Sequence, residues 1–436
     1  MKIKKGLSIF AISLIVVLFT STFVFSYDFN YDSYDFEGKT VTFVNWGDAW
    51  PTDDPDFQEQ ISVTENKFNC KIKLKSLSWG NYVEQLMQRV LSGDSKYDIW
   101  EMHSAFFHQL VSKDALYPVG ELISDKFFQD EFAKPDYNFF GYQGKKYSVS
   151  DPLPNPGWFA YIIWNKDLFE RQNLPNLYDI YQSGEWTWKK CEEVAKAATK
   201  DKDSDGNIDQ WGIGAFHQQP SVFAMTNGVM PTVKKDGKVV CNMEDPAYLE
   251  ALSTIYEWTM VDNIARGWSD STDFFNGELA MHIVGAGILW KAPGYKEKMK
   301  DEFGIVPLPK GPNAEKISYP MVAARAHVIP SNAENAEGLF ALHYFFRKKA
   351  VDDGLSEQDK LMEQIADAVY DEESYQVLME AYQNWDGTYH PFLSITDAPD
   401  LRSNMERAIK NGEPPAAVMA ERKPIVQSRL DELLNQ

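Results

Sequence analysis

The sequence of 436 residues has little cysteine and histidine and lacks the common short motifs of catalysis. Cys70, Cys191 and Cys241 are an odd set without paired spacing, which excludes a disulfide framework and leaves one bridge or buried free thiols open. The seven histidines do not cluster at metal-ligand spacing. Phosphate loops, dinucleotide fingerprints and the serine and zinc hydrolase motifs are missing. These absences argue against nucleotide-dependent enzymes and the common hydrolases.

Positive charge is also scarce. The chain has 43 lysines and arginines against 64 acidic residues, and its net charge is −21. Such a surface repels phosphate backbones and anionic membrane faces, which argues against nucleic-acid binding and peripheral lipid binding. An uncharged or cationic ligand suits it better.

Only one long hydrophobic run is present. It extends from Leu7 to Phe25, follows three lysines and ends in Val24-Phe25-Ser26. This pattern predicts a secretory signal peptide over residues 1–26, with an uncleaved anchor as the alternative. Cleavage removes Lys2, Lys4 and Lys5 and no acid, so the net charge of −21 becomes −24. No lipobox cysteine follows, and the expected location is periplasmic or extracellular.

Strands and helices alternate through the first part of the remaining chain. About 410 residues remain after cleavage, more than one hydrophobic core usually holds, so two domains are expected. The β-α-β-α-β order predicts an α/β fold with a parallel sheet. The expected strands are Lys39–Trp46, Lys71–Leu77 and Tyr97–Glu101, and the expected helices are Asp56–Phe68, Val83–Leu91 and Ser104–Val111.

The second part has a less regular pattern. A proline-rich stretch, Asp151–Pro156, predicts a crossing between domains, and Ser318–Ile329 is extended and predicts a crossing back. Strands are expected at Trp158–Trp164 and Leu279–Val284, with Thr187 as the N-cap of a helix that reaches about Lys200. Helical patterns cover Asn332–Phe346 and resume from Ser356, and Pro414, Pro415 and Pro424 are expected to divide the C-terminal part.

Thirteen tryptophans are the most conspicuous positive feature. A tryptophan ring covers the apolar face of a sugar, while carboxylates and guanidinium groups hydrogen-bond sugar hydroxyls. In parallel sheets, ligands bind outside the carboxyl ends of the strands. The three predicted strand ends carry aromatic and polar residues there, namely Asp48, Trp50, Trp79, Glu101 and His103.

Several motifs occur together in a characteristic order. They are Val41–Trp46, Leu91–Asp94 with Tyr97–Ile99, Trp164–Phe169, Trp186–Trp188, Asp205–Gly212, Phe275–Met281 and Gly304–Gly311. In this order and spacing, the chain resembles the maltodextrin-type (family 1) extracellular solute-binding proteins of ABC importers. The segment from about Ala350 to Arg402 adds little to the resemblance.

The resemblance implies a two-lobe periplasmic-binding-protein fold of type II, the Venus-flytrap arrangement. Each lobe would hold a mixed, mostly parallel sheet flanked by helices, and the lobes would close on ligand by a hinge. The expected divisions are residues 1–26 for the signal peptide, 27–152 and 323–352 for the N-lobe, and 153–322 and 353–436 for the C-lobe, the last of them helical.

The implied function is substrate binding for an ABC-type sugar importer. The protein would capture a mono- or oligosaccharide between its lobes and deliver it to permease subunits in the membrane, as a monomer and without catalysis or a required cofactor. Two alternatives stay open. One is a receptor for a peptide, a polyamine or a glycerol phosphodiester, and the other is a secreted glycoside hydrolase.

Position along the chain adds further candidate ligand residues. Trp158 follows the first crossing, and Trp290 follows the strand Leu279–Val284, near an aromatic residue that relatives stack on sugar. Arg325 lies at the second crossing, where its guanidinium could hold a hydroxyl pair or a carboxylate. Trp385 is a candidate second stacking platform. Packing in the core is the alternative for each.

The segment from Asp201 to Asp209 resembles a calcium loop. Oxygen-bearing side chains at Asp201, Asp203, Asp205 and Asp209, with Asn207 between them and a glycine at the sixth position, match an EF-hand loop. The twelfth position is glycine, where a bidentate glutamate is usual. A structural Ca²⁺ is one interpretation, and a metal-free surface turn is the other.

Overall fold

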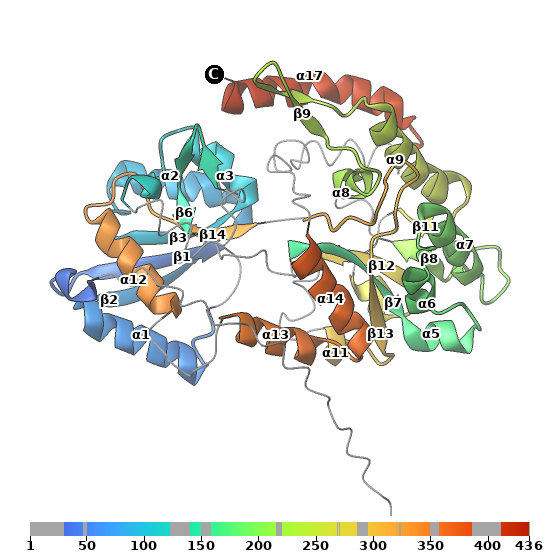
Figure 1. Ribbon diagram of the computed structural model, residues 1–436, viewed down its shortest axis with the longest axis horizontal. Coiled ribbons are helices and arrows are strands. Elements are labelled where there is room, and N and C mark those ends of the chain that lie inside the picture. Colours follow the sequence, from blue (N-terminus) through green and yellow to red (C-terminus); the bar gives the residue numbers. More distant parts are fainter. Residues whose placement is uncertain are drawn as a thin grey trace, which may run out of the picture.

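The computed structural model shows two α/β lobes side by side (Figure 1). The predicted signal peptide lies outside the residues that the structure describes. Within those residues, no helix is both long and apolar enough to cross a membrane. The described residues are 30–46, 50–122, 140–149, 158–214, 220–267, 269, 271–285, 295–321, 324–348, 357–385 and 411–435.

The N-lobe is built on a five-stranded sheet of order β2-β1-β3-β14-β6. Its first three strands are parallel and β14 is antiparallel to β3, so the sheet is mixed as expected. Side chains alternate across β1: Val41 and Phe43 pack toward α1 and α12, while Val44 and Trp46 pack toward α2 and α3. The elements are β1 (Thr40–Trp46), α1 (Pro55–Phe68), β2 (Lys71–Leu77), α2 (Tyr82–Ser92), β3 (Asp98–His103), α3 (Ser104–Val111), β6 (Ser148–Val149), β14 (Arg325–Val328) and α12 (Ala336–Lys348).

The C-lobe is built on a second five-stranded sheet of order β11-β8-β12-β7-β13. Strands β11, β8 and β12 run parallel, whereas β7 is antiparallel to both of its neighbours. The elements are β7 (Ala160–Asn165), α5 (Lys166–Arg171), α6 (Leu177–Gln182), α7 (Trp188–Ala198), β8 (Trp211–Gly214), α8 (Pro220–Met225), α9 (Pro246–Tyr256), β11 (Ala265–Arg266), α10 (Ser271–Phe275), β12 (Leu279–Gly285), α11 (Tyr295–Lys298), β13 (Phe303–Pro307), α13 (Glu357–Ala368) and α14 (Glu372–Asn384).

The chain changes sheets between β6 and β7 and returns between Met321 and Arg325. On the C-lobe side of the return, Ala160 donates its N–H to the Pro320 carbonyl. On the N-lobe side, Ser104 donates its N–H to the Ala324 carbonyl. We call residues 319–325 the crossing segment. A third passage follows α12, which packs on the N-lobe sheet, and leads to α14, which packs beside β13. The predicted domain boundaries stay predictions.

Local sequence signals explain many helix ends. Gly93 takes a left-handed conformation (φ 78°) and ends α2, and the Thr187 hydroxyl accepts the Lys190 N–H at the start of α7. One prediction is wrong: Pro424 does not divide the C-terminal helix but lies inside α17 (Pro415–Leu434). The helix continues because its buried face, which includes Val418, packs on α9 and the β9–β10 hairpin (Thr232–Lys235 and Lys238–Cys241).

The three cysteines are free thiols, and all are buried. Burial raises the pKa of Cys70 to about 12 and also raises the pKa of Cys191 and Cys241. A thiol with so high a pKa carries almost no thiolate near neutral pH. These cysteines therefore act as small apolar core residues.

Candidate binding site

The candidate site lies at one edge of the N-lobe sheet. Trp46 ends β1 and His103 ends the parallel neighbour β3, so their carboxyl ends meet at this edge. Arg325 begins β14 and lies opposite His103 in the antiparallel register. We define the N-lobe group as Trp46, Trp79, Glu101, His103, Phe106 and Arg325.

Aromatic contacts fix the orientation of Trp79. Its ring centroid lies 5.7 Å from that of Trp46, 5.1 Å from that of His103 and 4.4 Å from that of Phe106. Trp46 and Phe106 are buried, whereas Trp79 remains 44% exposed. The neighbours hold the ring in place while a large part of its surface stays open to a ligand.

The turn that carries Trp79 is anchored to the sheet. Trp79 opens a short 3₁₀ turn (Trp79–Asn81) that leads directly into α2. The next residue, Tyr82, is fully buried and donates its hydroxyl to the Glu101 carbonyl at 2.7 Å. This bond ties the turn to β3.

His103 is held in one tautomer. Its Nδ1 accepts the Ala105 N–H at 3.0 Å and so caps α3. Burial, with a smaller effect of the Arg325 charge, lowers the pKa of His103 to about 3. The ring is therefore neutral near pH 7 with its proton on Nε2, where it is a hydrogen-bond donor.

Arg325 and Glu101 form an ion pair whose net charge is zero. The guanidinium carbon of Arg325 lies 4.9 Å from the centre of the Trp46 ring, which is a cation–π contact. Its Nη1 lies 3.5 Å from Glu101 Oε1, and the two side chains are 35% and 21% exposed. The pair offers both donors and an acceptor, and the two charges balance.

The structure brings four predicted ligand residues together: Trp79, Glu101, His103 and Arg325. Trp50 lies elsewhere, since it is partly buried and its ring stacks on Phe57 against the core between the sheet, α1 and α12.

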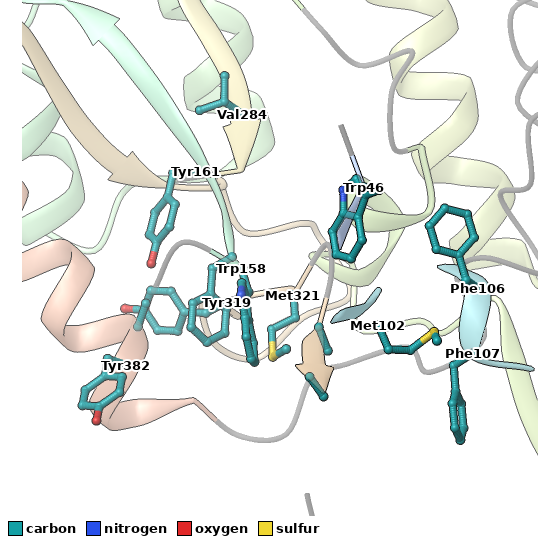
Figure 2. Close-up of a cluster of buried hydrophobic side chains, with 14 of the residues drawn as sticks. Trp46, Met102, Phe106, Phe107, Trp158, Tyr161, Val284, Tyr319, Met321 and Tyr382 are labelled. Atoms are coloured by element: carbon teal, nitrogen blue, oxygen red, sulfur yellow. The ribbon is translucent and has the colours of Figure 1, made fainter. Parts of the chain in front are cut away.

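The remaining predicted ligand residues are buried or not described. Trp158 and Trp385 are buried at 9% and 5% exposure, and Trp385 packs on Phe159. Figure 2 shows Trp158 beside Tyr319 and Met321, across from Trp46 and Phe106. Asp48 and Trp290 lie outside the described residues.

The sequence did not single out Trp46 or Phe106 as part of a site. Trp46 belongs to a predicted strand, where packing explains it, and the structure shows that it is buried. Its second role as a support for Trp79 and Arg325 depends on contacts between elements. Phe106 follows His103 by three residues, and this helical spacing was the one signal that could have indicated their proximity.

The Asp201–Asp209 loop brings three carboxylates together. One oxygen each from Asp201, Asp203 and Asp209 lies within 4.8 Å of the others. Backbone N–H groups of the loop already donate to Asp201 and Asp209, and Asn207 donates its side-chain amide to Asp205. The carboxylate oxygens suit a hard cation such as Ca²⁺, so this part of the predicted donor set fits.

Comparison with known proteins gives one family match. The model of a family described as bacterial extracellular solute-binding protein matches residues 48–351. A search of curated proteins gives no match.

Solved structures share the fold at low sequence identity. An ABC substrate-binding protein from Listeria monocytogenes, in complex with cycloalternan, is 17% identical with a TM-score of 0.67, covering 90% of this chain and 99% of that chain. A maltose/maltodextrin-binding domain from Bdellovibrio bacteriovorus, bound to maltotriose, is 18% identical with a TM-score of 0.63, covering 89% and 99%. A solute-binding protein from Thermotoga lettingae, bound to α-D-tagatose, is 15% identical with a TM-score of 0.65, covering 90% and 100%.

Proposed function

Because the chain belongs to the bacterial extracellular solute-binding protein family, we propose that it is the sugar-binding receptor of an ABC-type importer. It captures its ligand between the two lobes and delivers it to a membrane permease. The protein is exported, acts as a monomer and performs no catalysis. The saccharides in the three related structures support a sugar ligand.

The observation that carries the proposal is the N-lobe group. Trp79 presents an exposed ring whose position is fixed by three aromatic neighbours. Beside it are a neutral histidine donor and an arginine–carboxylate pair without net charge. An apolar face bordered by hydroxyl-binding donors and acceptors matches the surface of an uncharged sugar.

A thermal-shift screen tests the proposal. A ligand that binds only the folded protein raises its melting temperature (Tm). The panel contains maltotriose, mannotriose, tagatose, a tripeptide, spermidine and glycerophosphocholine, and we expect one or more saccharides alone to raise Tm. Stabilisation by a non-saccharide alone would contradict the proposal, and so would hydrolysis of chromogenic glycosides.

We further propose that the Asp201–Asp209 loop binds a structural Ca²⁺. The three carboxylates that lie together there support it, and the loop has no glutamate at its twelfth position, which makes the expected affinity modest. Calorimetric titration with CaCl₂ should give one site per chain, and Asp203→Asn should weaken it. A control, Asp236→Asn in the β9–β10 turn, should have no effect. Equal heats for the Asp203→Asn variant and the unsubstituted protein would exclude the site.

A further inference from the structure

Three polar side chains meet on the C-lobe side of the crossing segment. Tyr181 comes from α6, Tyr319 from the crossing segment and Glu380 from α14. The Tyr181 hydroxyl donates to Glu380 Oε2 at 2.5 Å and lies 3.1 Å from the Tyr319 hydroxyl. The Tyr319 hydroxyl lies 3.5 Å from the same carboxylate oxygen. We call these three residues the C-lobe group.

The Glu380 carboxylate is held in place by hydrogen bonds to only one of its two oxygens. Both tyrosine contacts involve Oε2, and within the described part of the chain Oε1 has no hydrogen-bond partner. Tyr181 and Glu380 are both partly exposed. A carboxylate that is fixed through one oxygen presents the other as a ready acceptor for a hydroxyl group.

A buried hydroxyl near the same group also lacks a partner. Tyr161 on β7 is fully buried, and its hydroxyl makes no hydrogen bond within the described residues. Figure 2 shows this hydroxyl pointing toward Tyr319, and burial, with a smaller effect of Tyr319, raises the pKa of Tyr161. An unpaired buried hydroxyl is costly, so this one, which lies beside Tyr319 of the C-lobe group, indicates a small polar partner such as a water or a ligand hydroxyl.

The length of chain between the two groups limits how far apart they lie. Tyr319 belongs to the C-lobe group and Arg325 to the N-lobe group, and the chain advances six positions from one to the other along the crossing segment. At about 3.3 Å per extended residue, the Cα atoms of Tyr319 and Arg325 lie at most about 20 Å apart. Within this limit, a ligand of several sugar rings can reach both groups.

We infer that Tyr181, Tyr319 and Glu380 form a second ligand-binding group, which accepts hydroxyl hydrogen bonds from an uncharged oligosaccharide whose other end lies on Trp79. The inference rests on the proposed sugar-receptor function and names its ligand class. Glu380 gives the C-lobe group a negative charge, so acidic sugars such as uronates are excluded by repulsion.

A structural brace is the competing role for the same residues. Bonds from Tyr319 to α6 and α14 would then only fix the crossing segment to the C-lobe. Glu380→Gln separates the two roles. Glutamine keeps a carbonyl oxygen for the Tyr181 hydroxyl but presents an NH₂ donor in place of the free acceptor. Tyr319→Phe removes the hydroxyl with little change in side-chain volume and serves as the second variant.

The experiment is calorimetric titration with maltotriose, mannotriose and mannose. For Glu380→Gln and for Tyr319→Phe, we expect the better trisaccharide to bind about tenfold more weakly, as for loss of a hydrogen bond to a charged group. Mannose binding should change by less than about twofold, because a single ring stacked on Trp79 does not reach the C-lobe group. The control Glu373→Gln, on the exposed first turn of α14, should bind as the unsubstituted protein does.

The ligand-free Tm of each variant completes the test. Unchanged trisaccharide affinity in both variants would overturn the inference, and a lower Tm with unchanged affinity would assign the residues to the brace. In both cases saccharide binding by the unsubstituted protein leaves the proposed function standing. Failure of the unsubstituted protein to bind any of the three saccharides would overturn the inference, and the thermal-shift panel would then decide the proposed function separately.

Discussion

At the scale of single residues, surface exposure separates a packing tryptophan from a tryptophan that is open to a ligand. Trp46 and Trp79 touch each other, yet only Trp79 keeps a large exposed surface. The sequence placed Trp79, His103 and Arg325 at strand ends and a crossing, and the structure brings them together. It could not indicate the Tyr319–Glu380 contact, because 61 residues separate the two side chains and only tertiary packing joins them.

Replacing Trp79 with alanine should weaken saccharide binding about tenfold or more, since it removes the exposed stacking face. Trp79→Phe keeps a smaller ring, so its saccharide affinity should lie between those of Trp79→Ala and the unsubstituted protein. Titration calorimetry measures the affinities. Met260→Ala is the matched control, because Met260 is 41% exposed and lies outside the N-lobe group. Equal affinities for Trp79→Ala and the control would remove Trp79 from the site.

Histidines with lowered pKa values, the buried His108 and the partly buried His103, should make the protein less stable in mild acid. Burial lowers the pKa of His108 to about 4, and that of His103 is about 3, while an ordinary histidine titrates near 6.5. Between these values the unfolded chain binds more protons than the folded one, so the free energy of unfolding falls as pH drops below about 6.5.

The variant His108→Phe isolates one of these protonation sites. His108 lies in α3 and is 4% exposed. From pH 7 to pH 5, the variant should lose about 1–2 kcal/mol less of its free energy of unfolding than the unsubstituted protein does. Urea denaturation at the two pH values measures both losses. Equal losses would show that His108 does not contribute to the acid sensitivity.

At the scale of elements, hydrophobic periodicity predicted the helices and strands of the N-lobe closely. The strand Lys71–Leu77 and the helix Ser104–Val111 have the predicted bounds. Pro424 shows the limit of local rules, because packing along one face of α17 outweighs a helix breaker on its exposed side. A buried ion pair that joins α2 to β3 was also not predicted.

That ion pair joins Arg89 to Asp98. Arg89 donates to both Asp98 oxygens at 2.7 Å, and the two side chains are 15% and 1% exposed. Burial raises the pKa of Asp98, and hydrogen bonds from Trp100 and Arg89 oppose this effect. Arg89→Met would leave the carboxylate buried without its counter-charge.

We expect Arg89→Met to lower the free energy of unfolding by about 3–5 kcal/mol at pH 7. The loss should shrink as pH falls, because a protonated Asp98 no longer carries a buried charge. Urea denaturation at pH 7 and pH 5 measures it. The control Arg171→Met breaks a pair whose arginine is 58% exposed and should cost less than about 1 kcal/mol. Similar losses for both variants would contradict the account.

Pro424 gives a prediction of the opposite sign. It lies inside α17, whereas Pro415 lies at the start, where proline is favourable. Pro424→Ala restores a backbone donor and should raise the free energy of unfolding by about 1–3 kcal/mol. Pro415→Ala should give no gain. Urea denaturation measures the free energy of unfolding of both variants. A loss of stability in Pro424→Ala would contradict the prediction and show that Pro424 stabilises α17.

At the scale of the whole molecule, the βαβ order of the sequence predicts the parallel part of the N-lobe sheet. It does not show that β14, which lies more than 200 residues beyond β3, completes the same sheet. This long-range pairing places Arg325 beside His103 and runs the crossing segment from the N-lobe group to the C-lobe group. The proposed ligand-binding surface, which consists of the N-lobe group and the C-lobe group, therefore depends on the fold of the entire chain.

The central claim is that the N-lobe group and the C-lobe group together bind an uncharged saccharide. Titration calorimetry of the unsubstituted protein with maltotriose and mannotriose at neutral pH tests it most directly. The account predicts saturable binding of at least one of them, with one ligand per chain and a dissociation constant of about 1 μM or lower, equivalent to about 8 kcal/mol. Absence of heat from both sugars, together with saturable binding of spermidine or a tripeptide, would contradict it.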